Sequence, residues 1–332
     1  MNAYQKTVIA TIIATIFLIS VGSLVRITGA GLGCPDWPKC WGCWFPPSSI
    51  EEVDMAYIQE KGYDIQEFNP IKMWTEYINR LVGVIIGFLV FLTFLRSVRY
   101  LKSQPAIFWY SCLSFALVGF QGWLGGQVVR SGLQPGIITL HMALAVLLLC
   151  VLIYATFKTG QDQNLENISS DFCSKLTRLS ILLFFFTCIQ MLIGTQVREG
   201  IDPFIKDAGG LPRSEWLGQV GMIDHVHRLS SWLVLITGIL IYRAIKTTRS
   251  AGLLPAISRW LLAGIVLQIF LGVLLAYASL PRYAQVLHLT LATLLLCGEW
   301  YLILVLRHAR HDVGTSAGHP VAGDQGFASI SH

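Results

Sequence analysis

The chain has 332 residues, of which 54% are hydrophobic and only 13% are charged, whereas soluble domains carry about 25% charged residues. This composition excludes a disordered chain, a nucleic-acid-binding protein with a basic face and nearly every ordinary soluble enzyme. A membrane-spanning helix needs about 20 mostly apolar residues, so eight of them would use roughly half of the chain. The net charge of +5 therefore bears on loop orientation more than on acidic partners.

Eight apolar runs predict an all-α membrane protein with eight spanning helices. The expected spans are 7–27, 75–95, 106–128, 137–157, 177–197, 222–242, 257–278 and 284–306. The first run leads into Arg26 and a Gly-rich turn instead of a cleavage site, so we interpret it as a span and not as a signal peptide. Two connecting loops are long, at 28–73 and 198–221, and the first is rich in Trp and Pro.

Basic residues are distributed unevenly between the two sets of loops. With the N-terminus in the cytoplasm, thirteen of the 24 Lys and Arg residues lie on the cytoplasmic side, and eight lie in the much longer outer loops. The positive-inside rule therefore predicts that both termini are cytoplasmic. The N-terminus shows no Arg/Ser-rich transit segment, which favours a bacterial plasma membrane.

Short motifs recur between the two halves of the chain. The matched pairs are Glu76-Tyr-Ile-Asn79-Arg80 with Asp224-His-Val-His227-Arg228, Gln121-x-x-Leu124-Gly125 with Gln268-x-x-Leu271-Gly272, and Gly22-Ser-Leu-Val-Arg26 with Gly194-Thr-Gln-Val-Arg198. Because four spans separate the copies, the repeat predicts two pseudo-symmetric four-helix bundles in parallel orientation. The expected organisation is an N-terminal half at 1–157, a cytoplasmic linker at 158–174, a C-terminal half at 175–310 and a disordered cytoplasmic tail at 311–332.

Histidines within the spans are candidates for a functional site, because polar residues in a membrane are costly. A lone membrane histidine is as often a structural hydrogen-bonder, but His227 and His288 open two spans at similar depth. Two imidazoles facing each other across a bundle suit the axial positions of a haem iron. His225 competes with His227 for this role. We favour His227, because it matches Asn79 in the repeat and directly precedes Arg228.

Glu76, Asn79 and Arg80 are expected on one face of a helix. Glu76 and Arg80 could form a local ion pair at the membrane interface. The functional interpretation is that Arg80 and Arg228 hold haem propionates, while Glu76 acts beside a reacting group as acid, base or charge stabiliser.

The first long loop contains Cys34, Cys40 and Cys43. Outside the cytoplasm a disulfide can persist there. Cys40-x-x-Cys43 also has a zinc or redox spacing, but without a second such pair a metal site is weakly supported. The remaining cysteines lie in or beside apolar spans and are expected to be small buried side chains.

Several of these motifs closely resemble those of the haem A synthase family. They are Gly29-Ala-Gly31-Leu-Gly33-Cys34-Pro-Asp-Trp-Pro-Lys-Cys40, Glu76-Tyr-x-x-Arg80 and His227-Arg228, and the likeness covers residues 6–306. The resemblance implies an eight-helix membrane enzyme that oxidises a methyl group of haem O to the formyl group of haem A, by successive hydroxylations, for cytochrome oxidase. It also implies haem O synthase and cytochrome oxidase assembly factors as partners, an electron donor that the sequence does not identify, and a possible homo-oligomer.

The same resemblance implies roles for individual residues. His227 and His288 would bind haem B, substrate haem O would occupy the first half near the iron ligand His141, Glu76 would be catalytic, and Cys34 and Cys40 would form a loop disulfide. Many members of the family carry histidine where this chain has Asn79. The first-half haem would then have one imidazole and an open or weakly filled second axial position.

Two other functions account for part of the sequence. A haem-bearing membrane cytochrome linked to quinol would explain the histidines and the repeat, and would explain the long Trp/Pro/Cys loop and Glu76 less well. A transporter built from parallel repeats would leave the histidine pairs without a purpose. Identification of the haems in purified protein would separate the three.

Overall fold

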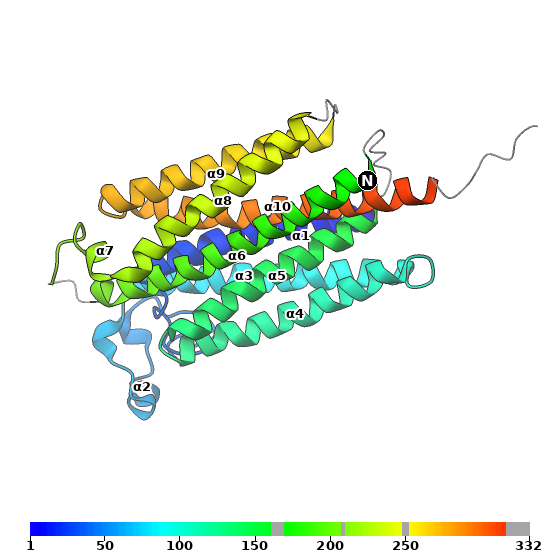
Figure 1. Ribbon diagram of the computed structural model, residues 1–332. Helices are drawn as coiled ribbons and strands as arrows, with labels where there is room; N and C mark the ends of the chain where they lie inside the picture. Colours follow the sequence, from blue (N-terminus) through cyan, green and yellow to red (C-terminus); the bar gives the residue numbers. More distant parts are fainter. Residues whose placement is uncertain (161–168, 207–209, 248–251, 317–332) are drawn as a thin grey trace, which may run out of the picture.

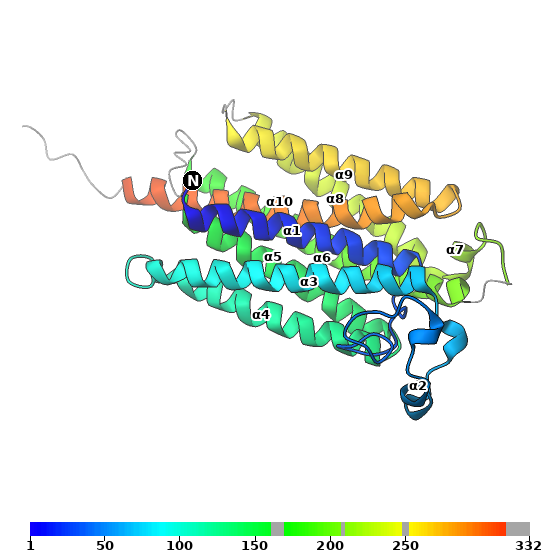
Figure 2. The same cartoon turned by 180° about the vertical axis from the view of Figure 1, so that it is seen from behind.

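The computed structural model describes residues 1–160, 169–206, 210–247 and 252–316. Within them, eight helices are long and apolar enough to cross a membrane, which confirms the predicted all-α membrane protein. They are α1 (Ala3–Ile27), α3 (Pro70–Ser97), α4 (Pro105–Arg130), α5 (Pro135–Lys158), α6 (Ser170–Lys206), α8 (Met222–Thr247), α9 (Leu253–Tyr277) and α10 (Arg282–Ser316). The N-terminus lies at one end of the bundle and the long loop after α1 lies at the other, which we call the loop end (Figures 1 and 2).

Two helices extend well beyond the spans that hydropathy predicts. Helix α6 begins at Ser170 and continues to Lys206. Helix α10 continues to Ser316, so helix occupies the first part of the predicted tail. The rest of that tail, 317–332, and residues 161–168 of the predicted linker lie outside the described residues.

Helix starts are set by local sequence signals. Asn2 caps α1 through a capping box, in which its side chain accepts from Gln5 N–H and the Gln5 side chain accepts from Asn2 N–H. Pro70, Pro105 and Pro135 each occupy the first turn of a helix, where the missing N–H has no intrahelical partner to lose. These capping signals determine where the helices begin, and the helices begin close to the span starts expected from hydropathy.

Helices from the same half of the sequence are neighbours. Helices α1, α3, α4 and α5 form one set of neighbours, and α6, α8, α9 and α10 form the other. The two sets meet where α1 and α5 pack on α10 and where α5 packs on α6, with α9 towards one edge of the bundle and α4 towards the other (Figure 1). Half of the apolar window of α10 is buried, against 28% or less in the other spans, which makes α10 the central helix. The pseudo-symmetry and the cytoplasmic placement of both termini remain predictions.

Large apolar side chains are exposed along the outer helices. Examples are Val84 and Phe88 on α3, Leu229 on α8 and Trp260 on α9. An apolar surface of this extent is unsuited to water and suits the hydrocarbon of a bilayer. The exposed faces therefore agree with a multi-pass membrane protein.

The loop between α1 and α3 folds into a small domain at the loop end. It contains η1 (Ile50–Glu52), α2 (Met55–Lys61) and η2 (Ile65–Glu67). Its core is a buried cluster of Cys34, Cys40, Trp41, Val53, Ile58 and Met73. Cys34 and Cys40 form a disulfide, as the family resemblance implied, and Cys43 is a free thiol.

Asp36 organises the backbone of this loop. Its carboxylate accepts hydrogen bonds from the N–H groups of Trp41 and Gly42 at 2.7 and 2.9 Å. The Tyr57 hydroxyl donates to the same carboxylate at 3.3 Å, and burial together with Asp36 raises the pKa of Tyr57 to about 12. The tyrosine therefore stays a hydrogen-bond donor over the physiological pH range.

Candidate functional site

A large cavity opens within the helix bundle and contains nearly all of the candidate residues. Its volume is about 2620 Å³, and residues of all eight long helices line it. Pockets for a drug-sized ligand measure roughly 300–1,000 Å³, so this cavity has room for more than one large flat ligand. The residues singled out from the sequence that line it are Glu76, Asn79, Arg80, His141, His227, Arg228 and His288.

His227 and His288 face each other across the second half of this cavity. Their ring centroids are 6.5 Å apart, and the ring planes are inclined by 67°. The Nδ1 atom of each ring is buried and has no hydrogen-bond partner among the described residues. Buried imidazole nitrogens are normally paired, and metal–imidazole bonds of about 2 Å on each side would fit one metal ion between rings at this separation. The pair therefore fits the two axial ligands of a haem iron.

His225 does not share this position. It is exposed, and it does not line the cavity. Side chains two residues apart on a helix differ in direction by about 200° around the helix axis. An orientation of α8 that points His227 towards His288 therefore points His225 away from it. The structure thus distinguishes the two histidines between which the sequence left a choice.

Each cavity histidine packs against a glycine of a neighbouring helix. A Cβ atom at Gly125, Gly194 or Gly272 would lie 3.6, 3.0 or 3.5 Å from the Cε1 atom of His141, His227 or His288, respectively. Each glycine follows a glutamine by four residues, at Gln121, Gln190 and Gln268. The motifs at Gln121 and Gln268 are among the repeats predicted from the sequence, whereas the one at Gln190 is not, although its Gln–Gly spacing is the same.

The glutamines of two of these motifs hold the backbone of the histidine-bearing helices. Gln121 Nε2 donates to His141 O at 3.0 Å, and Gln190 Nε2 donates to His227 O at 2.6 Å. Because a helix carbonyl accepts these bonds, the glutamine side chain fixes the rotation of the helix without occupying the imidazole Nδ1 atom, which has no hydrogen-bond partner among the described residues.

In the first half, Asn79 lies near Gly22, as His227 lies near Gly194 in the second half. A Cβ atom at Gly22 would lie 3.9 Å from Asn79 Oδ1, as one at Gly194 would lie beside His227. Asn79 Oδ1 and His141 Nδ1 are both buried without hydrogen-bond partners among the described residues. Two unsatisfied polar atoms on the wall of one cavity mark a position for a polar or metal-bearing ligand.

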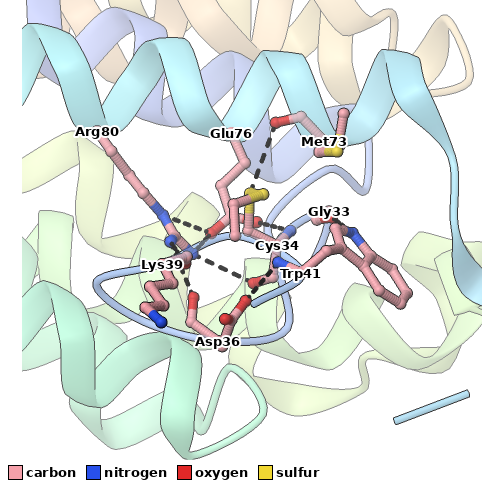
Figure 3. A network of polar contacts seen from close by, with 9 residues as sticks. Gly33, Cys34, Asp36, Lys39, Trp41, Met73, Glu76 and Arg80 are labelled. Carbon is pink, nitrogen blue, oxygen red and sulfur yellow. Dashed lines mark hydrogen bonds and ion pairs between the residues drawn. A yellow bond between two sulfur atoms is a disulfide. The ribbon is translucent and has the colours of Figure 1, made fainter. Parts of the chain in front are cut away.

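Glu76 and Arg80 fasten the disulfide loop to α3 (Figure 3). Glu76 is buried, its Oε2 accepts from Cys34 N–H at 2.9 Å, and its Oε1 pairs with Arg80. Arg80 Nη1 donates to Asp36 O and Lys39 O, at 2.8 Å each, and Nη2 donates to Cys34 O at 3.2 Å. The predicted ion pair is therefore present, and all three Arg80 nitrogens contact the loop or Glu76.

Gly33 permits this close approach of loop and helix. A Cβ atom there would lie 2.4 Å from Lys72 O, a distance that no side chain tolerates. The first residue of the Gly-Cys-Pro-Asp-Trp-Pro motif, Gly33, must therefore be glycine, because the loop backbone contacts the first turn of α3 there.

The matching acid and base in the second half make fewer contacts. Arg228 pairs with Asp224 at 2.5 Å, and Arg228 is 41% exposed whereas Asp224 is buried. Among the described residues, the Arg228 guanidinium donates no hydrogen bond to a backbone carbonyl. The two halves thus share a carboxylate–arginine pair, but only the first-half pair is used to anchor a loop.

Comparison with known proteins agrees with these features. The profile of a family described as cytochrome oxidase assembly protein, COX15-CtaA, matches residues 5–298. The chain is similar to proteins named haem A synthase, among them one of Shewanella oneidensis (25% identical, covering 86% of this chain and 91% of that protein). Others are from Granulibacter bethesdensis (25%, covering 90% and 85%) and Bradyrhizobium diazoefficiens (29%, covering 86% and 85%).

Proposed function

The chain belongs to the COX15-CtaA family of cytochrome oxidase assembly proteins, and from this we propose that it is a haem A synthase. It is a multi-pass protein of the plasma membrane and an enzyme of haem A biosynthesis that acts on haem O. The reaction we propose is the oxidation of a haem O methyl group by two successive hydroxylations. The resulting geminal diol loses water to give the formyl group of haem A.

The observation that carries this proposal is the pair of facing imidazoles in a cavity too large for one small ligand. A membrane cytochrome would need the histidine pair alone. It would not need the cavity to continue into the first half, where His141 and Asn79 present unsatisfied polar atoms. The named relatives also favour the synthase over an electron-transfer protein.

Haem B fits the second half of the cavity. His227 and His288 would hold it, since their rings face each other and their Nδ1 atoms have no hydrogen-bond partner in the part of the chain that the structure describes. Gly194 and Gly272 leave room beside the two rings, because neither position carries a Cβ atom. When bound, haem B supplies one-electron transfer to the substrate pocket.

Substrate haem O would occupy the first half. His141 would hold its iron from α5, and Asn79 would lie opposite as a weak or absent ligand. An open or weakly held axial position leaves the iron accessible, which an oxidation requires and a pure electron carrier does not.

Glu76 is proposed as the catalytic carboxylate at the loop end of this pocket. Its oxygens are held by Cys34 N–H and Arg80, which fixes the carboxylate at the cavity wall. From there it can accept a proton or stabilise positive charge that develops on the methyl carbon. Trp37 and Pro38 of the disulfide loop line the same cavity.

Haem analysis tests the proposal directly. The full-length protein is expressed with a haem O synthase in a bacterial host that makes no haem A, and acid-extracted haems are separated by chromatography. We expect haem A to appear, with haem B retained in the purified protein. Haem B alone, with haem O left unconverted, would favour the membrane cytochrome, and absence of any haem would favour a transporter.

A further inference from the structure

We propose that Arg198, Arg213 and Arg282 form a binding site for the carboxylates of the haem held between His227 and His288. All three arginines line the same cavity as the two histidines. This inference rests on the proposed function and adds to it the way in which the haem is oriented, with its carboxylate edge towards the loop end.

Three separate segments bring these arginines together. Arg198 lies near the end of α6, Arg213 lies in the segment before α7 (Trp216–Gln219), and Arg282 is the first residue of α10. Arg213 is within electrostatic reach of both others. Its Nη2 atom donates to Leu280 O at 2.9 Å, which ties it to the turn that precedes Arg282.

Arg213 is held in place but is not paired with a carboxylate of the described residues. Its guanidinium lies over the Trp216 ring, 5.3 Å from the centroid, and its Nε atom is buried without a partner among the described residues. Burial and the neighbouring Arg282 lower the pKa of Arg213. A guanidinium in this setting lacks one hydrogen-bond acceptor and one negative charge.

The nearby acids are already engaged. Asp202 accepts a hydrogen bond from Arg26 at 2.7 Å and forms an ion pair with Arg198 at 2.6 Å. Glu199 accepts from the Thr139 hydroxyl at 2.8 Å. Within the described chain, neither Arg213 nor Arg282 forms an ion pair with a carboxylate. The cluster therefore carries positive charge that an anionic ligand would balance.

The carboxylates on the edge of a haem match this site in their chemistry and in their distance from the iron. Arg282 precedes His288 by six residues on α10, which is about 9 Å along a helix. The carboxylate-bearing edge of a haem extends a comparable distance from its iron. Guanidinium groups bind carboxylates through paired, charge-assisted hydrogen bonds, so a haem ligated by His288 would place its acid groups among these arginines.

The experiment compares haem release from full-length proteins purified with haem bound. The variants are Arg213→Gln, Arg213→Lys and Arg282→Gln, and the matched control is Arg130→Gln. Arg130 also lies over a tryptophan, Trp37, and donates to the carbonyl of that residue, but it does not line the cavity. Haem transfer to an excess of a haem-scavenging protein is followed by absorbance, and the midpoint potential of the haem is measured by redox titration.

We expect Arg213→Gln to keep the low-spin spectrum of the haem, since both imidazoles remain. The loss of one charge-assisted interaction should accelerate haem release by about tenfold or more. It should also lower the midpoint potential, because a removed positive charge favours the ferric state. Arg282→Gln should act in the same direction, Arg213→Lys should recover part of the effect, and Arg130→Gln should match the wild type.

Haem B dimethyl ester, which keeps the iron and lacks the carboxylates, supplies the second arm. Loaded with the ester, the wild type and Arg213→Gln should release it equally fast. Equal release of ordinary haem B by wild type and Arg213→Gln overturns the inference while leaving the proposed function intact. An effect of Arg213→Gln that persists with the ester and depends on anionic lipid in nanodiscs also overturns it, in favour of a lipid phosphate. Wild-type protein that binds no haem overturns the proposed function and this inference together.

Discussion

The carboxylate of Glu76 accepts a hydrogen bond from the backbone N–H of Cys34 at 2.9 Å. This contact joins a residue in the second span to one end of the loop disulfide, 42 residues away in the chain. It means that the proposed catalytic carboxylate and the covalent closure of the loop belong to one unit. A change in either is therefore expected to affect the other.

Replacement of His227 or His288 by alanine should abolish the low-spin haem B spectrum of the purified protein. The two facing imidazoles are the proposed axial ligands of the iron. A haem with only one axial histidine becomes high-spin or is lost. His225→Ala is the matched control, because His225 is exposed and lies outside the cavity. Retention of the normal spectrum in both cavity variants would refute the ligand assignment.

Glu76→Gln should stop the conversion of haem O while haem B stays bound at the other site. Glutamine has one acceptor oxygen where the carboxylate has two, so either Cys34 N–H or Arg80 loses its partner. Haem O or a hydroxylated intermediate should accumulate in the extracted haems.

Glu60→Gln controls for the loss of a loop carboxylate, because Glu60 forms an exposed ion pair with Lys61. That variant should convert haem O at the wild-type rate. Normal haem A production by Glu76→Gln would reduce Glu76 to an anchor for the loop.

Asn79→His should convert the first-half haem to a bis-histidine, low-spin state. Asn79 matches His227 in the repeated sequence motif, and it lies near Gly22 as His227 lies near Gly194. Electron paramagnetic resonance of protein loaded with haem O should show a second low-spin signal. The signal should disappear when His141→Ala is added. An unchanged spectrum would show that α3 does not face the substrate iron.

The disulfide between Cys34 and Cys40 should be found by mass mapping under non-reducing conditions, with Cys43 open to alkylation. The double variant Cys34→Ser, Cys40→Ser should lose about 2 kcal/mol of stability, because a short closed loop restricts the unfolded chain. The loss should appear as faster proteolysis of the loop. A Cys40–Cys43 bridge or three free thiols would contradict the pairing.

Gly194→Ala should disturb the haem B site without unfolding the protein. The new methyl group would lie 3.0 Å from Cε1 of His227, so the imidazole must move. Overpacking of this kind costs about 1–3 kcal/mol, and the tilted ligand should shift the low-spin resonance. Gly119→Ala is the control, since a Cβ atom there meets nothing within 4 Å. Identical spectra for the two variants would mean that Gly194 is not needed for clearance.

The sequence by itself predicts the eight spans, since hydropathy over some 20 residues is a local property that the bilayer requires. It also contains the repeated motifs that draw attention to His227 and His288. The helices that begin at Pro70, Pro105 and Pro135 start a few residues before the spans expected from hydropathy at 75, 106 and 137. The family resemblance supplied the Cys34–Cys40 pairing, which spacing among the three loop cysteines left open.

Only the tertiary structure decided how these elements face one another. The choice between His227 and His225 depends on the rotation of α8 against its neighbours, to which the hydrogen bond from Gln190 contributes. The attachment of Arg80 to loop carbonyls and the approach of Arg213 to the turn before α10 join segments far apart in the chain. Hydropathy and helical periodicity describe each helix alone, whereas these contacts arise from the packing of several helices at once. No pattern within a single segment could specify them.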